Sequence, residues 1–216
     1  MHFTVAVVGA GAIGGFIAAA LARSGNRVAV VARGAHLAAM RASGSISVAS
    51  SDLGAFEAPV QAARDLRELP PAEYVLLTFK SHQWEGMLEQ LQAALEQGAT
   101  IVTLQNGMPF WYSSSYAIEA VDPGGVLQHA IPPGRIIGGV VHASGHIAAP
   151  GVVAQSGGML YPLGELDGSS TARIMALAQA FAAAGLNAPV EPAIRRPMQR
   201  RSTSTAATCS RRTATR

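Results

Sequence analysis

The sequence predicts an α/β protein with a doubly wound, mostly parallel sheet and helices on both faces. Short β-branched runs without charged residues alternate with Ala- and Leu-rich stretches of helical period. A glycine-rich turn joins the first such run to the first helical stretch. The 216 residues are 49% hydrophobic and include one cysteine, which excludes a chain disordered throughout, a disulfide scaffold and a cysteine-based zinc site.

The chain opens with the pattern of a βαβ unit. A valine-rich strand is expected at residues 3–8, and a helix at residues 12–24 follows it. A second apolar strand is expected at residues 28–32, with a second helix at residues 35–42. Strand, glycine turn, helix and strand in this order form a crossover that is almost always right-handed.

The middle of the chain continues this alternation. Because the strands are apolar throughout, we expect most of them in a parallel sheet that is covered on both faces. Two later strands follow Pro- and Gly-rich turns, and an antiparallel direction is open for them. The expected elements are strands at residues 74–79, 101–104, 136–142 and 152–155, and helices at residues 84–97 and 173–184.

Residues 3–22 carry no charged side chain, and 20 such positions could span a membrane or form a signal peptide. Four glycines at fixed spacing divide this stretch, and no basic segment precedes it. We therefore expect a soluble, cytoplasmic protein with no membrane partner.

Charge separates the end of the chain from the rest. Residues 195–216 contain seven arginines and no acidic residue, whereas residues 1–194 contain nine basic and thirteen acidic residues. From residue 198 onward the sequence has no helical or strand period and almost no large apolar residue. Three interpretations of this tail are open: a disordered extension, a basic nucleic-acid arm, or sequence that is not the natural continuation of the fold.

The glycine-rich turn matches G-x-G-x-x-G between a strand and a helix start, the context in which Rossmann-type folds bind a dinucleotide. The first glycine permits the tight turn, the second lets a pyrophosphate approach the backbone, and the third permits close packing of helix on strand. The helix N-terminus supplies free N–H groups to the phosphates. A glycine turn without a ligand is the alternative. The residues concerned are Gly9, Ala10, Gly11, Ala12, Ile13 and Gly14.

Arg33 follows the second expected strand, at the position that distinguishes NAD from NADP. NAD sites usually place Asp or Glu there to hold the ribose 2′-hydroxyl. A guanidinium would instead pair with a 2′-phosphate, so NADP(H) is the expected cofactor. The alternative is a solvated charge at the end of a strand.

Two more polar residues follow expected strands. Lys80 is the only lysine in the chain and follows the strand at residues 74–79, and Asn106 follows the strand at residues 101–104. Ligands bind at the carboxyl ends of the strands in a doubly wound sheet, so we expect these residues to share one site with Gly9 and Arg33. Taken singly, Lys80 could be a solvated charge and Asn106 part of a turn.

No metal site is assigned. His142 and His146 are four residues apart, but the Ser-Gly pair between them predicts a turn. Glu165 and Asp167 could suggest a catalytic carboxylate pair. Their flanking glycines instead predict a turn, followed by a helix start near Ser169.

Taken together, these segments resemble the ketopantoate reductases (2-dehydropantoate 2-reductases), over about residues 1–196. The resemblance implies NADPH-dependent reduction of 2-dehydropantoate to pantoate, toward pantothenate and coenzyme A, by hydride transfer to a 2-oxo acid. The segments that carry it are residues 8–15 (VGAGAIGG), 32–34 (ARG), 78–83 (TFKSHQ), 104–108 (LQNGM), 138–145 (GGVVHASG) and 149–151 (APG).

The resemblance also implies roles for particular residues. The segment from Gly9 to Gly14 would hold the pyrophosphate and Arg33 the 2′-phosphate. Lys80 and Asn106 would lie at the nicotinamide end of the cofactor, near the substrate, and the backbone around Ser144 would touch the cofactor. Residues 1–168 are then expected to form the NADP-binding domain, residues 169–196 a helix and connector, and residues 197–216 the basic tail.

The sequence departs from this family after residues 193–195 (AIR). Relatives continue into a helix with a Trp-x-Lys signature, whose lysine donates the proton to the substrate, and then into a helical domain. Residues 197–202 (PMQRRS) contain neither Trp nor Lys, and arginine cannot replace a general acid of tunable pKa. We therefore expect no catalytic acid in this chain and favour a frameshifted or truncated product that lacks the helical domain.

Three functional hypotheses follow. The first is an NADPH-dependent reductase of a small 2-oxo acid, and the second is a catalytically inactive NADP-binding module. The third is another Rossmann-type dehydrogenase, which Lys80 and Asn106 at those strand ends disfavour. No nucleic-acid partner is expected, and the oligomeric state does not follow from the sequence.

Overall fold

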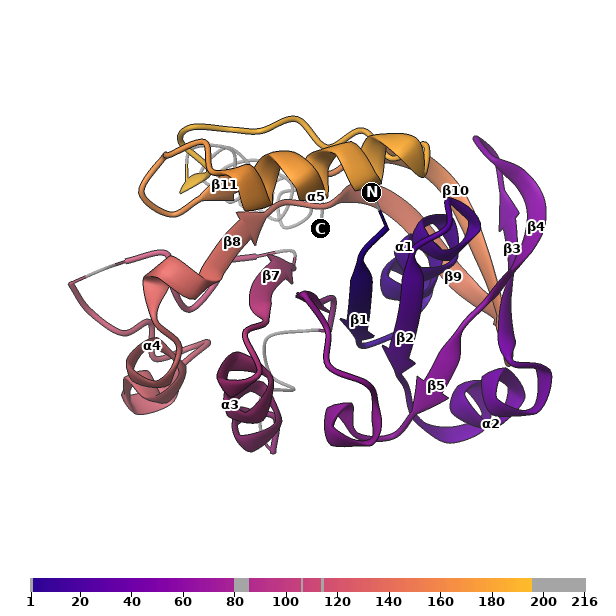
Figure 1. Ribbon diagram of the computed structural model, residues 1–216, viewed down its shortest axis with the longest axis horizontal. Coiled ribbons are helices and arrows are strands. Elements are labelled where there is room, and N and C mark those ends of the chain that lie inside the picture. The colour runs from indigo at the N-terminus through magenta and orange to yellow at the C-terminus, as the bar shows by residue number, and fades with distance from the viewer. Residues whose placement is uncertain (1, 80–85, 106, 114, 196–216) are drawn as a thin grey trace, which may run out of the picture.

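The structure is a computed structural model of the chain (Figure 1). It describes residues 2–79, 86–105, 107–113 and 115–195, to which every structural statement below refers. Lys80, Asn106 and the basic tail at residues 197–216 lie outside the described residues, so the predictions made for them stay predictions.

The main sheet has seven strands in the order β11-β8-β7-β6-β1-β2-β5. Six of them run parallel to one another, and β11 pairs antiparallel with β8 at one edge. The predicted doubly wound, mostly parallel sheet is therefore confirmed. Its strands are β1 (Thr4–Val8), β2 (Arg27–Val31), β5 (Gln61–Ala63), β6 (Tyr74–Leu77), β7 (Thr100–Leu104), β8 (Ile136–Gly139) and β11 (Leu163–Glu165).

Helices cover both faces of this sheet and bury two separate cores. Alternate residues of β1 point to opposite faces, with Val5 and Val7 in one core and Ala6 and Val8 in the other. The first core includes α1 (Ala12–Arg23), α2 (Gly34–Ser43) and α5 (Ala172–Ala183), and the second includes α3 (Leu88–Glu96) and α4 (Val126–Ala130). Short 3-10 helices lie at Leu66–Glu68, Pro123–Gly125 and Pro133–Arg135.

A second, four-stranded sheet packs on the outer side of α1, at the right of Figure 1. Its strands are β3 (Ser45–Ser50), β4 (Gly54–Pro59), β9 (His142–Ala149) and β10 (Val152–Leu160), in the order β4-β3-β10-β9. The packing is close, because a Cβ added at Gly15 of α1 would lie 2.9 Å from a methyl carbon of Val153. Helix α1 is thus held between two sheets. The sequence analysis predicted only part of β10 among these strands.

Three local predictions were wrong. The strand expected at residues 136–142 is divided, since β8 ends at Gly139 and β9 begins in the other sheet at His142. A Cβ at Gly139 would lie 2.7 Å from a Leu104 methyl carbon and 3.0 Å from the Thr103 carbonyl oxygen, so there is little room for a side chain at the end of β8. The turn expected between His142 and His146 is extended strand, because His142, Ser144, Gly145 and His146 all pair with residues of β10.

The turn expected around Glu165 is also extended, because Glu165 is the last residue of the edge strand β11 and is 4% exposed. Gly168 does form a turn, and the following helix begins at Ala172 with Thr171 as its N-cap. Helix α5 crosses the top of Figure 1 and buries Ile174, Leu177 and Phe181 in the same core as α1. The hydrophobic core is therefore continuous across residue 168, where the sequence predicted the end of the NADP-binding domain.

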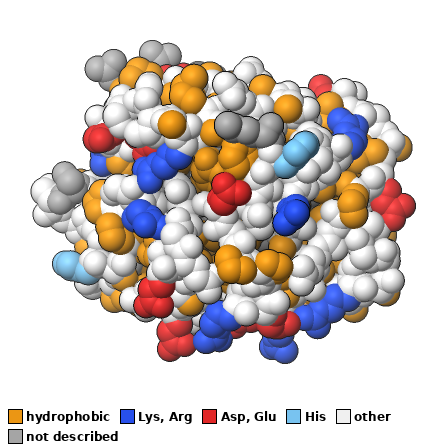
Figure 2. Space-filling model, in the orientation of Figure 1, with side chains coloured by type: hydrophobic (Ala, Val, Ile, Leu, Met, Phe, Trp, Pro, Cys, Tyr) orange, Lys and Arg blue, Asp and Glu red, His pale blue; other side chains and the backbone are white. Residues whose placement is uncertain are grey.

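The surface seen in the same view carries acidic and basic side chains interspersed, with no extended patch of one sign among the described residues (Figure 2). No helix among the described residues is both long and apolar enough to cross a membrane. The described residues also hold no group of three or more His, Cys, Asp or Glu side chains arranged to bind a metal ion.

Candidate functional site

The register of the main sheet aligns the carboxyl ends of four parallel strands. Val8 pairs with Val31 on one side and with Leu77 on the other, and Leu77 pairs with Thr103. The residues that follow these strands therefore lie along one edge of the sheet, where doubly wound proteins bind their ligands. They are Gly9 after β1, Arg33 after β2, Thr78 and Phe79 after β6, and Gln105 after β7.

The glycine loop begins at Gly9, which fits closely against Phe79. The φ of Gly9 is +93°, in the left-handed region that glycine adopts without strain, and a Cβ there would lie 3.0 Å from the Phe79 nitrogen. The N–H groups of Gly9 and Ala10 both donate to the Val31 carbonyl, at 3.1 and 3.0 Å. The loop is thereby fixed to the ends of both β2 and β6.

The two later glycines of the motif have different surroundings. A Cβ at Gly14 would overlap the Thr78 hydroxyl oxygen and lie 2.5 Å from the Gly9 carbonyl oxygen. At Gly11 the nearest atom to an added Cβ is the Gly9 carbonyl oxygen, 3.9 Å away. Gly14 is thus required by packing of α1 on the sheet, whereas at Gly11 the described residues leave space beside the backbone, as a bound pyrophosphate would require.

The described residues leave the N-terminus of α1 open to an anion. Its N-cap is Gly11, which has no side chain to cap the helix, and no acidic residue lies in its first turn. The unpaired N–H groups and the positive end of the helix dipole then face the carboxyl edge of the sheet. The Thr78 hydroxyl donates to the Gly9 carbonyl at 2.8 Å, which ties the glycine loop to the end of β6.

Arg33 is the exposed N-cap residue of α2, two residues after the end of β2. Its carbonyl accepts from the Leu37 N–H at 3.3 Å, but its side chain forms no hydrogen bond or ion pair with another described residue. Its guanidinium is therefore available to a ligand at this edge, where it offers a planar fork of donors that suits a phosphate. The predicted location of Arg33 beside the glycine loop is in agreement with the strand register.

Gln105 joins the ends of β6 and β7, a contact that the sequence analysis did not identify. Its side-chain amide donates to the Phe79 carbonyl at 2.7 Å, and Gln105 is 9% exposed. Phe79 and Gln105 are the residues immediately before Lys80 and Asn106, which lie outside the described residues. The bond therefore ties together the two strand ends from which the predicted nicotinamide-side residues continue.

Replacing Gln105 by leucine is expected to lower the stability of the fold by about 1–3 kcal/mol, because the buried Phe79 carbonyl loses this donor. For a chain of this size that is a fall in Tm of roughly 3–10 °C in a circular dichroism melt. Gln92→Leu is the matched control, since Gln92 lies on the exposed surface of α3. Equal melting temperatures for the two variants would contradict the structural role of Gln105.

Ser144 lies in the second sheet rather than at the strand ends. It belongs to β9, pairs with Gly157 of β10 and is exposed. No hydrogen bond joins it to the glycine loop in the described part of the chain. A contact between the Ser144 backbone and a cofactor therefore stays a prediction.

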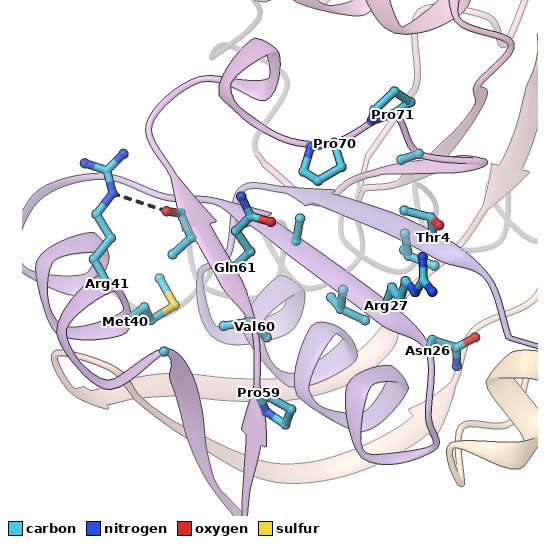
Figure 3. A pocket seen from close by; sticks show the side chains of 16 residues that line it. Thr4, Asn26, Arg27, Met40, Arg41, Pro59, Val60, Gln61, Pro70 and Pro71 are labelled. Atoms are coloured by element: carbon cyan, nitrogen blue, oxygen red, sulfur yellow. Dashed lines mark hydrogen bonds between the residues drawn. The ribbon is translucent and has the colours of Figure 1, made fainter.

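A large cavity of about 850 Å³ lies at the other edge of the sheet (Figure 3). The amino ends of β1 and β2 line it, through Thr4 and Arg27, and Pro70 lies across from Pro59 and Val60. Arg41 at its border is already engaged with the Ala62 carbonyl at 3.2 Å. Because the glycine loop is at the carboxyl edge, this cavity does not belong to the candidate site.

Comparison with known protein families assigns residues 5–168 to the family described as "Ketopantoate reductase PanE/ApbA". This match covers most of the chain, including the glycine loop, the end of β2 and both sheets. The chain belongs to the ketopantoate reductase family. The resemblance seen in the sequence is therefore confirmed.

Relatives within the ketopantoate reductase family are longer than this chain. A 2-dehydropantoate 2-reductase of Mesorhizobium japonicum is 39% identical over 199 residues, which are 88% of this chain and 60% of that protein. The chain thus spans about three-fifths of the length of that relative.

Solved structures of ketopantoate reductases share the fold. One from Ralstonia solanacearum, named a putative ketopantoate reductase, is 31% identical with a TM-score of 0.84, over 92% of this chain and 63% of that one. A 2-dehydropantoate 2-reductase from Geobacter metallireducens is 31% identical with a TM-score of 0.75, over 90% of this chain and 60% of that one. A D-mandelate dehydrogenase solved with NADH, at 22% identity and a TM-score of 0.67, has the same fold.

Proposed function

We propose that this chain is the cofactor-binding part of an NADPH-dependent 2-dehydropantoate 2-reductase. In this function it binds NADPH at the carboxyl edge of the main sheet for hydride transfer to a 2-oxo acid. The observation that carries the proposal is the open glycine loop at the N-terminus of α1, in a chain of the ketopantoate reductase family. The family relation also favours a cytoplasmic enzyme of the pathway toward pantothenate.

The residues present fit a dinucleotide with a 2′-phosphate. The space beside Gly11 and the uncapped first turn of α1 suit a pyrophosphate, and Ala10, Ala12 and Ile13 complete that loop. The unpaired Arg33 suits the 2′-phosphate, and no carboxylate takes its place to repel one. Lys80, Asn106 and the backbone at Ser144 are proposed to complete the nicotinamide side of the site.

The chain's own residues bind and orient the cofactor in this proposal. When bound, NADPH supplies the hydride from its nicotinamide ring to the ketone carbon of the substrate. The N-terminus of α1 would hold the pyrophosphate, and the residues that follow β6 and β7 would orient the nicotinamide. The apolar ends of these strands exclude water from that side, since Leu77 and Leu104 are buried.

A second candidate function is NADP binding without catalysis. The observation that favours it is the sequence of residues 197–202, which lacks the Trp-x-Lys signature and hence the proton donor of the family. In this alternative residues 1–168 still form an NADP-binding domain, residues 169–196 lead toward a helical domain, and residues 197–216 add no catalytic group. Addition of 2-dehydropantoate to the NADPH complex separates the two candidates. Oxidation of NADPH supports the reductase, and tight binding without oxidation supports the inactive module.

Replacing Arg33 by alanine is expected to weaken NADPH binding about 10- to 100-fold, because charge-assisted hydrogen bonds to the 2′-phosphate are lost. NADH lacks this phosphate, so its affinity is expected to change less than about threefold. Titration of both cofactors by nicotinamide fluorescence measures the two affinities on one preparation. Arg27→Ala is the control, because Arg27 is an exposed arginine at the opposite end of β2.

Equal effects of Arg33→Ala on the two cofactors would remove Arg33 from the 2′-phosphate site. Absence of NADPH binding by the unaltered chain would overturn the proposed function as a whole.

A further inference from the structure

His36 is a buried polar side chain in the first turn of α2, three residues after Arg33. It is 9% exposed, and its Nδ1 accepts a hydrogen bond of 2.9 Å from the N–H of Gly151. Because Nδ1 accepts, a neutral ring carries its proton on Nε2. Nε2 is buried without a well-formed hydrogen bond to a described residue, yet the Ala10 carbonyl lies close enough to the ring to raise its pKa.

The neutral ring is the form that this contact needs. Burial lowers the pKa of His36, and the Ala10 carbonyl opposes that lowering only in part. At neutral pH the ring is therefore uncharged and its Nδ1 is free to accept. A protonated ring would instead present an N–H group to the N–H of Gly151.

His36 lies where three segments that are far apart in the sequence meet. They are the glycine loop at Ala10, the first turn of α2, and the turn between β9 and β10 at Gly151, which is 115 positions from His36. Gly151 has a φ of +79°, and a Cβ there would lie 3.1 Å from the Ala39 Cβ. The turn between β9 and β10 thus packs directly on α2, and His36 supplies its hydrogen bond to that helix.

The position of Arg33 depends on this helix start. Arg33 is the N-cap of α2, and its side chain has no hydrogen bond or ion pair with another described residue. The backbone of the first turn of α2 therefore determines the position from which the Arg33 side chain extends. The glycine loop is fixed separately, through the bonds of Gly9 and Ala10 to Val31. His36 adds a second connection, between α2, the loop at Ala10 and the turn at Gly151.

We propose that His36 is a positioning residue for the 2′-phosphate end of the cofactor site, holding the first turn of α2 and thus Arg33 in register with the glycine loop. This inference rests on the proposed function, in which Arg33 binds the 2′-phosphate. Misplacement of a phosphate-binding side chain by a fraction of an ångström weakens its charge-assisted bonds. NADH has no 2′-phosphate, so its affinity does not depend on this register.

Two substitutions of His36 test the proposal on the full chain. Leucine fills much of the ring volume but offers Gly151 no acceptor, whereas asparagine keeps an acceptor oxygen near the position of Nδ1. Fluorescence titration at pH 7.5 is expected to give NADPH binding about five- to tenfold weaker for His36→Leu, with NADH binding changed less than about twofold. His36→Asn is expected to bind NADPH within about twofold of the unaltered chain.

Combination with Arg33→Ala shows whether His36 acts through Arg33. The double variant is then expected to bind NADPH no more weakly than Arg33→Ala alone. Additive losses, or equal losses for NADPH and NADH, would overturn the proposal and leave His36 a purely structural residue. If His36→Leu fails to fold, His36→Gln replaces it, because its amide extends past the Nδ1 position yet stays polar.

The same titrations separate failure of this inference from failure of the proposed function. Loss of NADPH selectivity in Arg33→Ala, without loss in His36→Leu or His36→Gln, overturns the role of His36 alone. Unchanged NADPH affinity in Arg33→Ala overturns both, because the site to be positioned would not exist. Circular dichroism melts of each variant confirm that folded proteins are being compared.

Discussion

Gly11→Ala is expected to reduce NADPH affinity about 30- to 100-fold while the protein still folds. Gly14→Ala is expected instead to lower the Tm of the protein. Both substitutions add one methyl group within the same turn. At Gly11 the methyl enters the open space beside the loop, 3.9 Å from the nearest atom, the Gly9 carbonyl oxygen. It then occupies the volume through which a pyrophosphate approaches the N–H groups of α1.

Gly14 faces the sheet instead of the opening. An added methyl group would overlap the Thr78 hydroxyl and press on the Gly9 carbonyl, so α1 would have to move away from β1 and β6. Overpacking of this kind costs roughly 3 kcal/mol, equivalent to a fall in Tm of about 6–12 °C for a chain of this size. Neither alanine strains the backbone itself, because Gly11 is extended with a φ of −80° and Gly14 is helical.

The two variants are measured by the same pair of experiments, NADPH titration and a circular dichroism melt. The expected pattern is a loss of binding with an unchanged melt for Gly11→Ala, and a lowered melt for Gly14→Ala. Unimpaired NADPH binding by Gly11→Ala would mean that the turn serves the packing of α1 alone. That outcome would favour the interpretation of the motif as a glycine turn without a ligand.

The main sheet could be predicted because each of its strands is a local signal. Buried parallel strands such as β1 and β2 are valine-rich and uncharged, and the glycine turn between β1 and α1 has a fixed spacing. Most of the second sheet gives no such signal, and only the start of β10 was predicted. Strands β3 and β4 are rich in Ser, Ala and Gly, and β10 pairs with β3 across about a hundred residues. Pairing of that kind follows from tertiary packing on α1, which spacing in the sequence does not encode.

The candidate site divides in the same way. The glycine loop and Arg33 are found from the sequence because each depends on its neighbours along one strand end. The bonds from Gln105 to Phe79 and from Gly151 to His36 join residues 26 and 115 positions apart. Glutamine and histidine side chains are often exposed, so nothing in the sequence indicates that Gln105 and His36 are buried. Only the fold shows that both are buried at the site. A histidine close after the Arg33 position was the one available signal, and by itself it predicts nothing.

Glu165, which was expected in a turn, forms a buried ion pair at the end of β11. It ends β11 as a nearly buried carboxylate and accepts hydrogen bonds of 2.5 Å from the Thr171 hydroxyl and of 2.8 and 2.5 Å from Arg173. The hydrogen bonds to this carboxylate raise the pKa of the Arg173 guanidinium further above its ordinary value. The same arginine donates to the Gly134 carbonyl at 2.6 Å, and its own carbonyl accepts from Tyr74 at 2.8 Å. The ion pair thus fastens the start of α5 to β11, and the Tyr74 bond fastens it to β6.

Replacing Glu165 by alanine is expected to destabilise the protein by about 3 kcal/mol, because the Arg173 charge loses its partner and Thr171 loses its acceptor at the N-cap of α5. Breaking a buried ion pair costs about 3–5 kcal/mol, and the lower value applies because the Arg173 side chain is 28% exposed. Urea unfolding followed by circular dichroism measures the change. Glu89→Ala is the matched control, because Glu89 pairs with Arg67 at 3.6 Å while 83% exposed.

Breaking that exposed pair is expected to cost less than about 1 kcal/mol. Equal effects of the two substitutions would mean that α5 is held by its apolar face alone, through residues such as Leu177 and Phe181. A larger effect of Glu165→Ala, with no further loss on adding Arg173→Ala, would establish the pair as a single unit. Because α5 lies beside α1, partial unfolding of α5 would also disturb the cofactor site. NADPH binding by Glu165→Ala is then expected to weaken at temperatures where this variant begins to unfold.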